Sequence, residues 1–108
     1  MITKKSKIFL AGHLGLVGSS IYRKLKLNGY KKVLISSKKN LDLRNQNDVN
    51  KFIKINKPDC VIIAAGKVGG IVANSMYTGE FIYDNVMIAS NLIHSSYKNN
   101  VKNLIYLG

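Results

Sequence analysis

The chain has 108 residues with 17 Lys and Arg against 5 Asp and Glu, which gives a formal net charge of +12. This length allows one domain with a modest core and excludes a cofactor domain joined to a separate substrate domain. A hydrophobic share of 46% is typical of a soluble globular protein, and no apolar run reaches the roughly 18 residues of a membrane span. We therefore expect a cytoplasmic protein without a signal peptide or membrane segment.

The basic charge raises the question of nucleic acid as a partner, because clustered Lys and Arg release counterions from phosphate backbones. Of the 17 basic residues, 15 are Lys, scattered through predicted turns and helix surfaces. They lack the interleaved aromatic residues of a base-stacking platform. We expect solvated lysines, with no nucleic acid, membrane or metal as a partner.

Short apolar runs alternate with helix-length segments along the whole chain. The runs predict strands at 7–11, 32–36, 60–65 and 103–108, and the segments between them predict helices at 16–28, 47–56 and 79–98. This alternation predicts an α/β fold with a parallel sheet covered on both faces, a Rossmann-type doubly wound sheet with only its first four to five strands. Cys60, the single cysteine, is expected to be a small buried hydrophobe.

Each predicted helix has apolar residues at helical spacing, which indicates the face that it buries. Gly29 ends the first helix and Pro58 stops the second. The expected buried positions are Val17, Ile21 and Leu25; then Val49, Phe52, Ile53 and Ile55; then Phe81, Ile82, Val86, Ile88, Ala89, Leu92 and Ile93. His94, beside the last of these, is expected to be a partly buried structural histidine. Residues 66–80 are predicted to be an irregular loop, and a long loop after a buried parallel strand is usually functional.

Three glycines follow the first predicted strand directly and open the first predicted helix, in "FLAGHLGLVGSS". Gly12 would turn the chain out of the strand, Gly15 would let a pyrophosphate approach the backbone, and Gly18 would let the helix pack closely on the sheet. A helix N-terminus offers unpaired N–H groups and a partial positive charge to such a phosphate. The spacing is one residue longer than the usual fingerprint, and a plain strand-to-helix turn is the alternative.

The end of the second predicted strand indicates which dinucleotide would bind. An NAD site usually has Asp or Glu there to hold the ribose hydroxyls, whereas this chain has "SSKK" from Ser36 to Lys39. Hydroxyl and ammonium groups suit a 2′-phosphate, so we predict NADP rather than NAD. Asp42, which comes slightly later, fits an adenine pocket better than a ribose. A solvated turn is the alternative for Lys38 and Lys39.

With these motifs, the chain resembles the extended short-chain dehydrogenase/reductase family and, within it, the GDP-L-fucose synthases. The resemblance rests on "FLAGHLGLVGSSI", on "AAGKVGGIVANSMYTGEFIYDNVMIASNLIHSS" and on "LIYLG". It implies the N-terminal part of an NADP-binding Rossmann domain over residues 1–108, a substrate domain outside the chain, and a homodimer of the full-length protein. The cofactor residues that it implies are Gly12, His13, Leu14, Gly15, Leu16, Val17, Gly18, Lys38, Lys39, Asn40, Leu41, Asp42, Leu43, Ala64, Ala65, Gly66, Lys67, Leu107 and Gly108.

Two departures from the family pattern qualify the resemblance. Leu14 stands where these synthases often have an Arg, so one positive group near the adenosine phosphate is missing. The catalytic Ser, Tyr and Lys of the family fall beyond Gly108, so we expect no catalytic residue in this chain and no activity from it alone. Tyr22 and Lys26 have the family's Tyr-x-x-x-Lys spacing, but they lie on the first helix, where the family does not place the pair.

Three functions remain open on the sequence alone. The first is the NADP-binding portion of an epimerase-reductase that makes GDP-L-fucose from GDP-4-keto-6-deoxy-mannose, with the GDP-sugar bound only by a longer protein. The second is a stand-alone nucleotide-binding or regulatory module. The third is another NAD(P)-dependent sugar-nucleotide epimerase or dehydratase, which the "KVGGIVAN" block disfavours.

Overall fold

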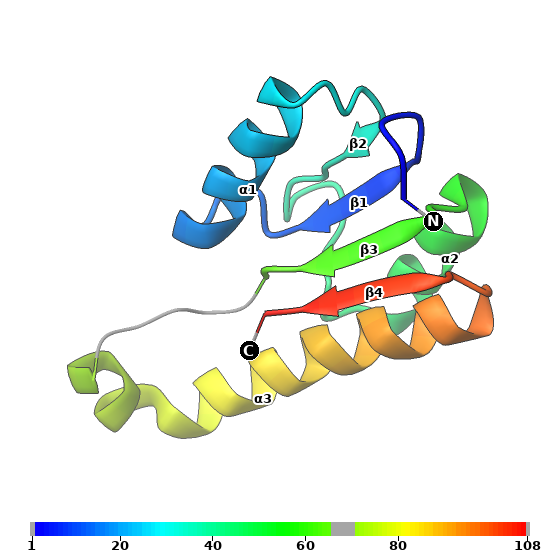
Figure 1. Cartoon of the computed structure of the whole chain (residues 1–108). Helices are drawn as coiled ribbons and strands as arrows, with labels where there is room; N and C mark the ends of the chain where they lie inside the picture. Colours follow the sequence, from blue (N-terminus) through cyan, green and yellow to red (C-terminus); the bar gives the residue numbers. More distant parts are fainter. Residues whose placement is uncertain (1, 66–70, 108) are drawn as a thin grey trace.

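A computed structural model describes residues 2–65 and 71–107. For residues 71–78 and 80–82 it describes the backbone but not the side chains. Strands and helices alternate throughout this part of the chain, as the sequence predicts (Figure 1). The elements in chain order are β1 (Ile8–Ala11), α1 (Leu16–Leu27), β2 (Val33–Leu34), α2 (Gln46–Asn56), β3 (Cys60–Ile63), α3 (Ile71–Lys98) and β4 (Asn103–Tyr106).

The four strands form one parallel sheet in the order β2-β1-β3-β4. Ile8 of β1 is in register with Val33 of β2 and with Cys60 of β3, and Cys60 is in register with Asn103 of β4. All four strands therefore end at the same edge of the sheet, where the glycine loop also begins. The α/β class and the parallel sheet are confirmed.

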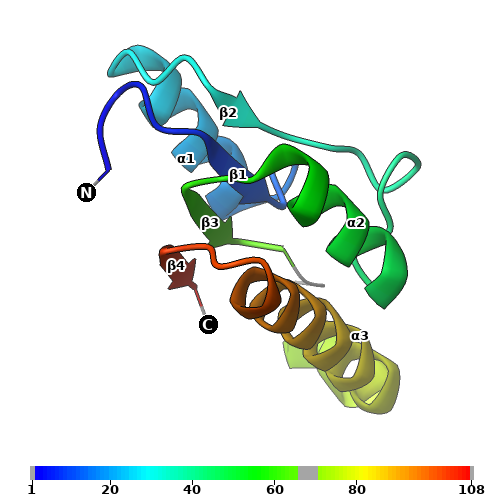
Figure 2. The same ribbon diagram turned by 90° about the vertical axis from the view of Figure 1, so that its right-hand side faces the viewer.

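Helices cover both faces of the sheet, which gives two separate cores (Figures 1 and 2). Alternate strand residues point to opposite faces, so Ile8, Leu10, Cys60 and Ile62 pack toward α1. Phe9, Val61 and Ile63 pack toward α2 and α3, together with Val49, Ile53 and Leu92. Cys60 is buried as expected, and burial raises the pKa of its thiol.

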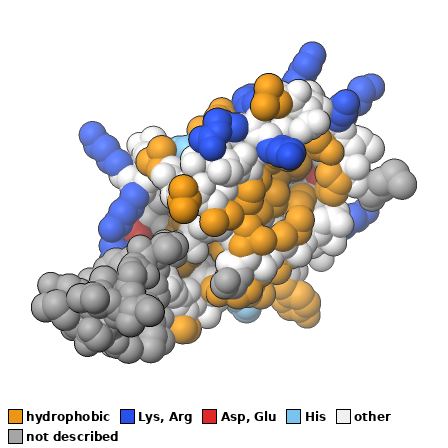
Figure 3. Space-filling model, turned by 60° about the vertical axis from the view of Figure 1, so that its left-hand side comes forward, with side chains coloured by type: hydrophobic (Ala, Val, Ile, Leu, Met, Phe, Trp, Pro, Cys, Tyr) orange, Lys and Arg blue, Asp and Glu red, His pale blue; other side chains and the backbone are white. Residues whose placement is uncertain are grey.

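The strand β4 lies at an edge of the described sheet and is only partly covered. Leu104, Ile105, Tyr106 and Leu107 are each at least 40% exposed, although their neighbours in β3 are buried. The helix α1 lies over β1 and β2, and no helix of the described residues lies in front of β4 in Figure 1. In Figure 3, where the molecule is turned by 60°, hydrophobic side chains are gathered in the middle of the face that includes β4. An apolar strand edge of this kind favours association.

Two sequence predictions about the helices were wrong. The helix α3 begins at Ile71, so residues 71–80 are helical and not an irregular loop, while residues 66–70 lie outside the described part. The glycine and the polar residues before residue 80 obscured the helical pattern there. The buried face differs only in part. Leu92 is buried and Ile88 packs against the core as predicted, but Asp84 and Asn91 are buried too, whereas Val86, Ile93 and His94 are exposed. The side chains of Phe81 and Ile82 lie outside the described part.

The other two helices bury smaller faces than the sequence indicates. In α1, Ile21 and Leu25 pack on the sheet, but Val17 is exposed and Tyr22 takes its place in the core. In α2, Val49 and Ile53 are fully buried and Ile55 is exposed.

Gly79 provides a test of the extended α3, because it lies inside the helix with nothing within 4 Å of an added Cβ. We expect Gly79→Ala to stabilise the fold by about 1 kcal/mol, which raises the melting temperature by on the order of 4 °C. Thermal unfolding followed by circular dichroism measures this change. Gly29→Ala is the control, since the φ of +86° at Gly29 makes alanine unfavourable there. A lower melting temperature for Gly79→Ala would contradict the helical assignment.

Candidate functional site

The glycine loop is built around two close backbone contacts. Gly12 follows β1 with φ +96°, and a Cβ on it would lie 2.6 Å from the Cα of Ala65, just after β3. A Cβ on Gly18 would collide with the Gly12 carbonyl oxygen. Both glycines are therefore required for α1 to begin this close to the sheet.

Gly15 has a different environment. It is the N-cap of α1 in an extended conformation, with φ −73° and ψ 171°, and its added Cβ would meet only the Gly12 oxygen, at 3.6 Å. That distance is an ordinary contact, so the fold does not require glycine at this position. No side chain caps the helix, and its first turn has no acidic residue. The N-terminal end of α1 is therefore open to an anion.

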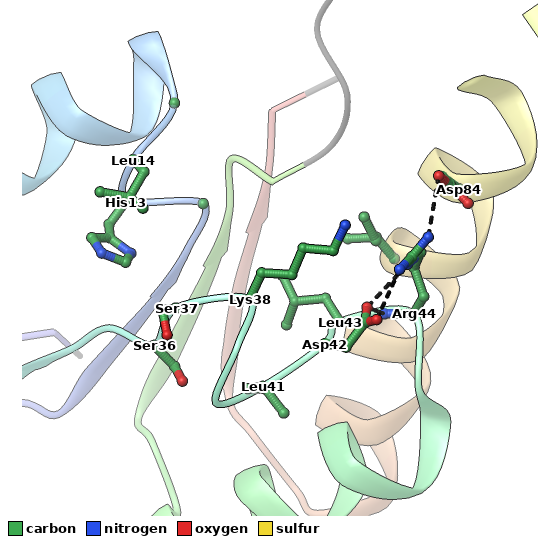
Figure 4. Close-up of a pocket in the computed structure, with 13 residues that line it drawn as sticks. His13, Leu14, Ser36, Ser37, Lys38, Leu41, Asp42, Leu43, Arg44 and Asp84 are labelled. Atoms are coloured by element: carbon green, nitrogen blue, oxygen red, sulfur yellow. Dashed lines mark hydrogen bonds and ion pairs between the residues drawn. The ribbon is translucent and has the colours of Figure 1, made fainter. Parts of the chain in front are cut away.

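A pocket of about 240 Å³ lies beside this loop, between α1 and α3. Figure 4 shows His13 and Leu14 on one side, Asp84 of α3 on the other, and the chain from Ser36 to Arg44 between them. The lining residues are Gly12, His13, Leu14, Gly15, Ser36, Ser37, Lys38, Leu41, Asp42, Leu43, Arg44, Asp84 and Ile88. The glycine loop, the residues after β2 and the inner face of α3 thus meet at the carboxyl edge of the sheet, where parallel α/β sheets bind ligands.

Arg44 joins two walls of the pocket. Its Nε donates to Asp42 Oδ1 at 3.0 Å and its Nη2 donates to Asp42 Oδ2 at 2.9 Å, a two-point contact between guanidinium and carboxylate. Its Nη1 lies 3.6 Å from Asp84 Oδ2 on α3. These contacts lower the pKa of Asp42 to about 2, mainly through the hydrogen bonds from Arg44, and they raise the pKa of Arg44. Asp42 therefore carries a fixed negative charge.

Further hydrogen bonds hold the same loop in place. The Asn91 side chain of α3 donates to the Leu43 carbonyl oxygen at 2.9 Å. Leu41 is buried in the core, and Asn45 caps α2 by accepting a hydrogen bond from the Asp48 N–H at 3.1 Å. The loop between β2 and α2 is thus attached to the core and to both helices of that face.

The structure brings together part of the predicted cofactor set. Eight of its members line the pocket: Gly12, His13, Leu14, Gly15, Lys38, Leu41, Asp42 and Leu43. Gly18, Ala64 and Ala65 lie beside the loop without lining the pocket, and Leu16, Val17, Lys39, Asn40 and Leu107 are also outside the lining. Gly66, Lys67 and Gly108 lie outside the described residues. The role of the whole set in binding a cofactor stays a prediction.

Three lining residues, Arg44, Asp84 and Ile88, were missed by sequence reasoning. Asp84 is four residues before Ile88 and eight before Leu92, so a helical face that includes Leu92 would have placed it inward. The sequence signal for Arg44 was weaker. It consisted only of an Arg two residues after an Asp, in a chain that has two arginines. Ser36 and Ser37, whose hydroxyl groups we expect to suit a 2′-phosphate, do line the pocket.

Residues 8–108 match the NAD dependent epimerase/dehydratase family. The chain belongs to this family. Within the described residues, no group of three or more His, Cys, Asp or Glu could hold a metal ion. The described helices are also too short or too polar to cross a membrane.

Relatives of this chain include several sugar-nucleotide enzymes. A putative GDP-L-fucose synthase 2 of Arabidopsis thaliana is 49% identical over 108 residues, which are 100% of this chain and 33% of that protein. The GDP-L-fucose synthase of Escherichia coli K12 is 43% identical over 104 residues, 96% of this chain and 32% of that protein. This chain therefore spans about a third of the length of the curated relatives that it matches.

Solved structures of sugar-nucleotide enzymes also match this chain. MlghC, a GDP-mannoheptose C4 reductase from Campylobacter jejuni with NADP bound, matches with a TM-score of 0.94 at 39% identity, over 100% of this chain and 34% of that one. A GDP-L-fucose synthetase from Naegleria fowleri bound to NADP matches with a TM-score of 0.79 at 26% identity, over 98% of this chain and 31% of that one.

The contact between Asp42 and Arg44 can be tested by titration. We expect Arg44→Gln to raise the pKa of Asp42 from about 2 toward its ordinary value of about 3.9, as measured by carboxyl NMR. Because the folded pKa of the unmodified chain lies below the unfolded one, the stabilisation is present above about pH 4 and is lost as the pH falls toward 2. The variant should lack this part of the acid sensitivity. An unchanged Asp42 titration would show that Arg44 is not its partner in solution.

Proposed function

We propose that the chain forms the NADP-binding portion of a cytoplasmic sugar-nucleotide epimerase-reductase that makes GDP-L-fucose from GDP-4-keto-6-deoxy-mannose. The family membership supports the cofactor class, and the identity to GDP-L-fucose synthases, 49% and 43% for the two relatives above, supports the substrate class. The chain spans a third of those proteins, and we assign the groups that act on the sugar to the part of the relatives that it does not match.

The environment of Gly15 carries this proposal. Gly12 and Gly18 are explained by the fold alone, whereas the missing side chain at Gly15 leaves open the helix end where a pyrophosphate would bind. A bound dinucleotide would supply a hydride for the reduction. The pocket of about 240 Å³ is smaller than the roughly 300–1,000 Å³ of most whole ligand pockets, which suits a site for the adenosine end only.

Two features favour NADP over NAD. Lys38, Ser36 and Ser37 line the pocket and offer an ammonium group and hydroxyls to a 2′-phosphate. The end of β2 has no carboxylate to hold the ribose hydroxyls, because the first one in the chain after it is Asp42, four residues beyond Lys38. NADP is also the dinucleotide in the titles of the Campylobacter and Naegleria structures.

Titration of the purified chain with NADPH and NADH, followed by nicotinamide fluorescence, tests the proposal. We expect NADPH to bind more tightly and Gly15→Asp to abolish the binding of both. Aspartate is a favourable N-cap, so this variant should keep α1 intact while it places a negative charge where the pyrophosphate would lie. Gly15→Ala is the milder companion, because its methyl group fits without a clash. If the folded chain binds neither nucleotide, or if Gly15→Asp binds as well as the parent, the proposal fails.

The preference for NADPH is expected to depend on Lys38. We predict that Lys38→Gln weakens NADPH binding by about tenfold, the value of one charge-assisted hydrogen bond, and leaves NADH binding nearly unchanged. Lys51→Gln is a matched control, because Lys51 is an exposed lysine of α2 that does not line the pocket. Equal losses for the two nucleotides would assign Lys38 a role other than 2′-phosphate recognition.

We further propose that the protein is a homodimer that associates through the outer face of α3. Tyr83, Val86, Ile93 and Tyr97 are exposed, and the helical period places them on one stripe opposite the buried face. A contiguous exposed apolar stripe of this kind marks an interaction surface.

Sedimentation velocity tests the dimer. We predict that the double substitution Val86→Lys and Ile93→Lys converts dimer into monomer without loss of the circular dichroism spectrum. Ile55→Lys is the control, since Ile55 is an exposed apolar residue on α2, away from the stripe on α3. A parent chain that is monomeric at micromolar concentration, or a double variant that remains dimeric, would overturn the proposed interface.

A further inference from the structure

Arg44 has an unusual set of contacts for a loop residue. Its guanidinium donates two hydrogen bonds to the Asp42 carboxylate and also approaches the buried Asp84 carboxylate on α3. Only the Asp42 contact is local in sequence, and the second one joins segments 40 residues apart. Figure 4 shows the guanidinium between the two carboxylates, at the end of the pocket away from the glycine loop.

The carboxylate that Arg44 holds is a fixed hydrogen-bond acceptor at the pocket wall. Asp42 is partly exposed, with 38% of its side chain accessible, and it lines the pocket. Oδ1 accepts two hydrogen bonds from Arg44, from Nε and from the backbone N–H, whereas Oδ2 accepts one, from Nη2. Oδ2 therefore keeps a second lone pair that can accept a hydrogen bond from a ligand. The Asp42 side chain also accepts from the Arg44 backbone N–H at 3.0 Å, which further restricts its rotation.

We propose that Arg44 is the positioning residue of this pocket: it fixes the Asp42 carboxylate and ties the 41–45 loop to α3, so that the pocket selects a base with an amino group. This inference rests on the proposed function, in which the adenosine end of the dinucleotide lies against residues 38–43. An ionised carboxylate only accepts hydrogen bonds, so a fixed one favours adenine, which has an amino group at C6, over hypoxanthine, which has a carbonyl oxygen there.

The guanidinium fork is essential to this role. A carboxylate that can rotate would turn to the N1–H of hypoxanthine and bind both bases, whereas one held at two points cannot follow. Lysine keeps the positive charge but is a point donor on a flexible stem, and it cannot make the two parallel hydrogen bonds. Arg44→Lys therefore separates the geometry of the fork from its charge.

The first measurement compares the affinity of the chain for NADPH and for the NADPH analogue in which hypoxanthine replaces adenine. We expect the parent to prefer NADPH by about tenfold, as one well-placed hydrogen bond predicts. Arg44→Gln and Arg44→Lys should both reduce this preference to about twofold or less, and the loss should fall mainly on NADPH. Arg23→Gln is the matched control, because Arg23, the other arginine of the chain, is exposed on α1, donates to Ser20 Oγ and does not line the pocket.

The second measurement needs no cofactor. The Asn45 N–H donates to the Asp42 carbonyl oxygen at 3.0 Å, and the Arg44 N–H donates to the Asp42 side chain, so both amides report on the loop. We expect hydrogen exchange at residues 44 and 45 to become at least about tenfold faster in both Arg44 variants and to remain unchanged in Arg23→Gln.

The two measurements separate the failure of this inference from that of the proposed function. A folded parent that binds neither nucleotide would sink the proposed function and, with it, the role in base selection. Unchanged exchange at residues 44 and 45 in Arg44→Gln would overturn the positioning role whatever the binding result. If Arg44→Lys keeps the base preference of the parent, the positive charge alone is sufficient and the fork geometry is not needed. That outcome also contradicts the proposal.

Discussion

The close approach of α1 to the sheet is the constraint on which the rest of the site depends. Gly12 packs against Ala65, and Gly18 packs against the Gly12 carbonyl, so the first turn of α1 begins directly over the carboxyl ends of β1 and β3. Any side chain at these two positions would push the helix away from the strands. The position of the open helix end, and with it one wall of the pocket, therefore follows from two backbone contacts.

The opposite wall is built from polar contacts. The inner face of α3 buries Asp84 and Asn91 beside Ile88 and Leu92, and these polar groups hold the loop after β2 through Arg44 and the Leu43 carbonyl. A buried carboxylate is tolerated only with partners, so this wall has a preferred arrangement where an apolar one could slide. One wall is rigid because backbone atoms are in contact, and the other because charged groups are paired.

The sequence predicted the features that are local and periodic. The strands, the parallel class and the glycine loop all follow from short patterns, and Gly29 and Pro58 mark helix ends within a few residues. The start of α3 was not predicted, because Gly79 is a tolerated helix interior residue. Asp84 and Asn91 were not assigned to its buried face, because polar residues are seldom found there. Arg44 was missed for a related reason: its partner Asp84 lies 40 residues away, and single-sequence patterns carry no signal for one long-range ion pair.

The polar inner face of α3 and its apolar outer face have a common explanation. A helix of a monomer usually buries its apolar stripe and exposes its polar one, yet here Tyr83, Val86 and Ile93 are exposed while Asp84 and Asn91 are buried. The inner polar residues hold the pocket wall, so the apolar surface that would normally secure the helix is turned outward. The exposed apolar residues of β4 add to this surface at the other side of the sheet. An α3 that serves the pocket with its polar residues therefore leaves an apolar stripe exposed, and the proposed contact with a second copy would bury that stripe.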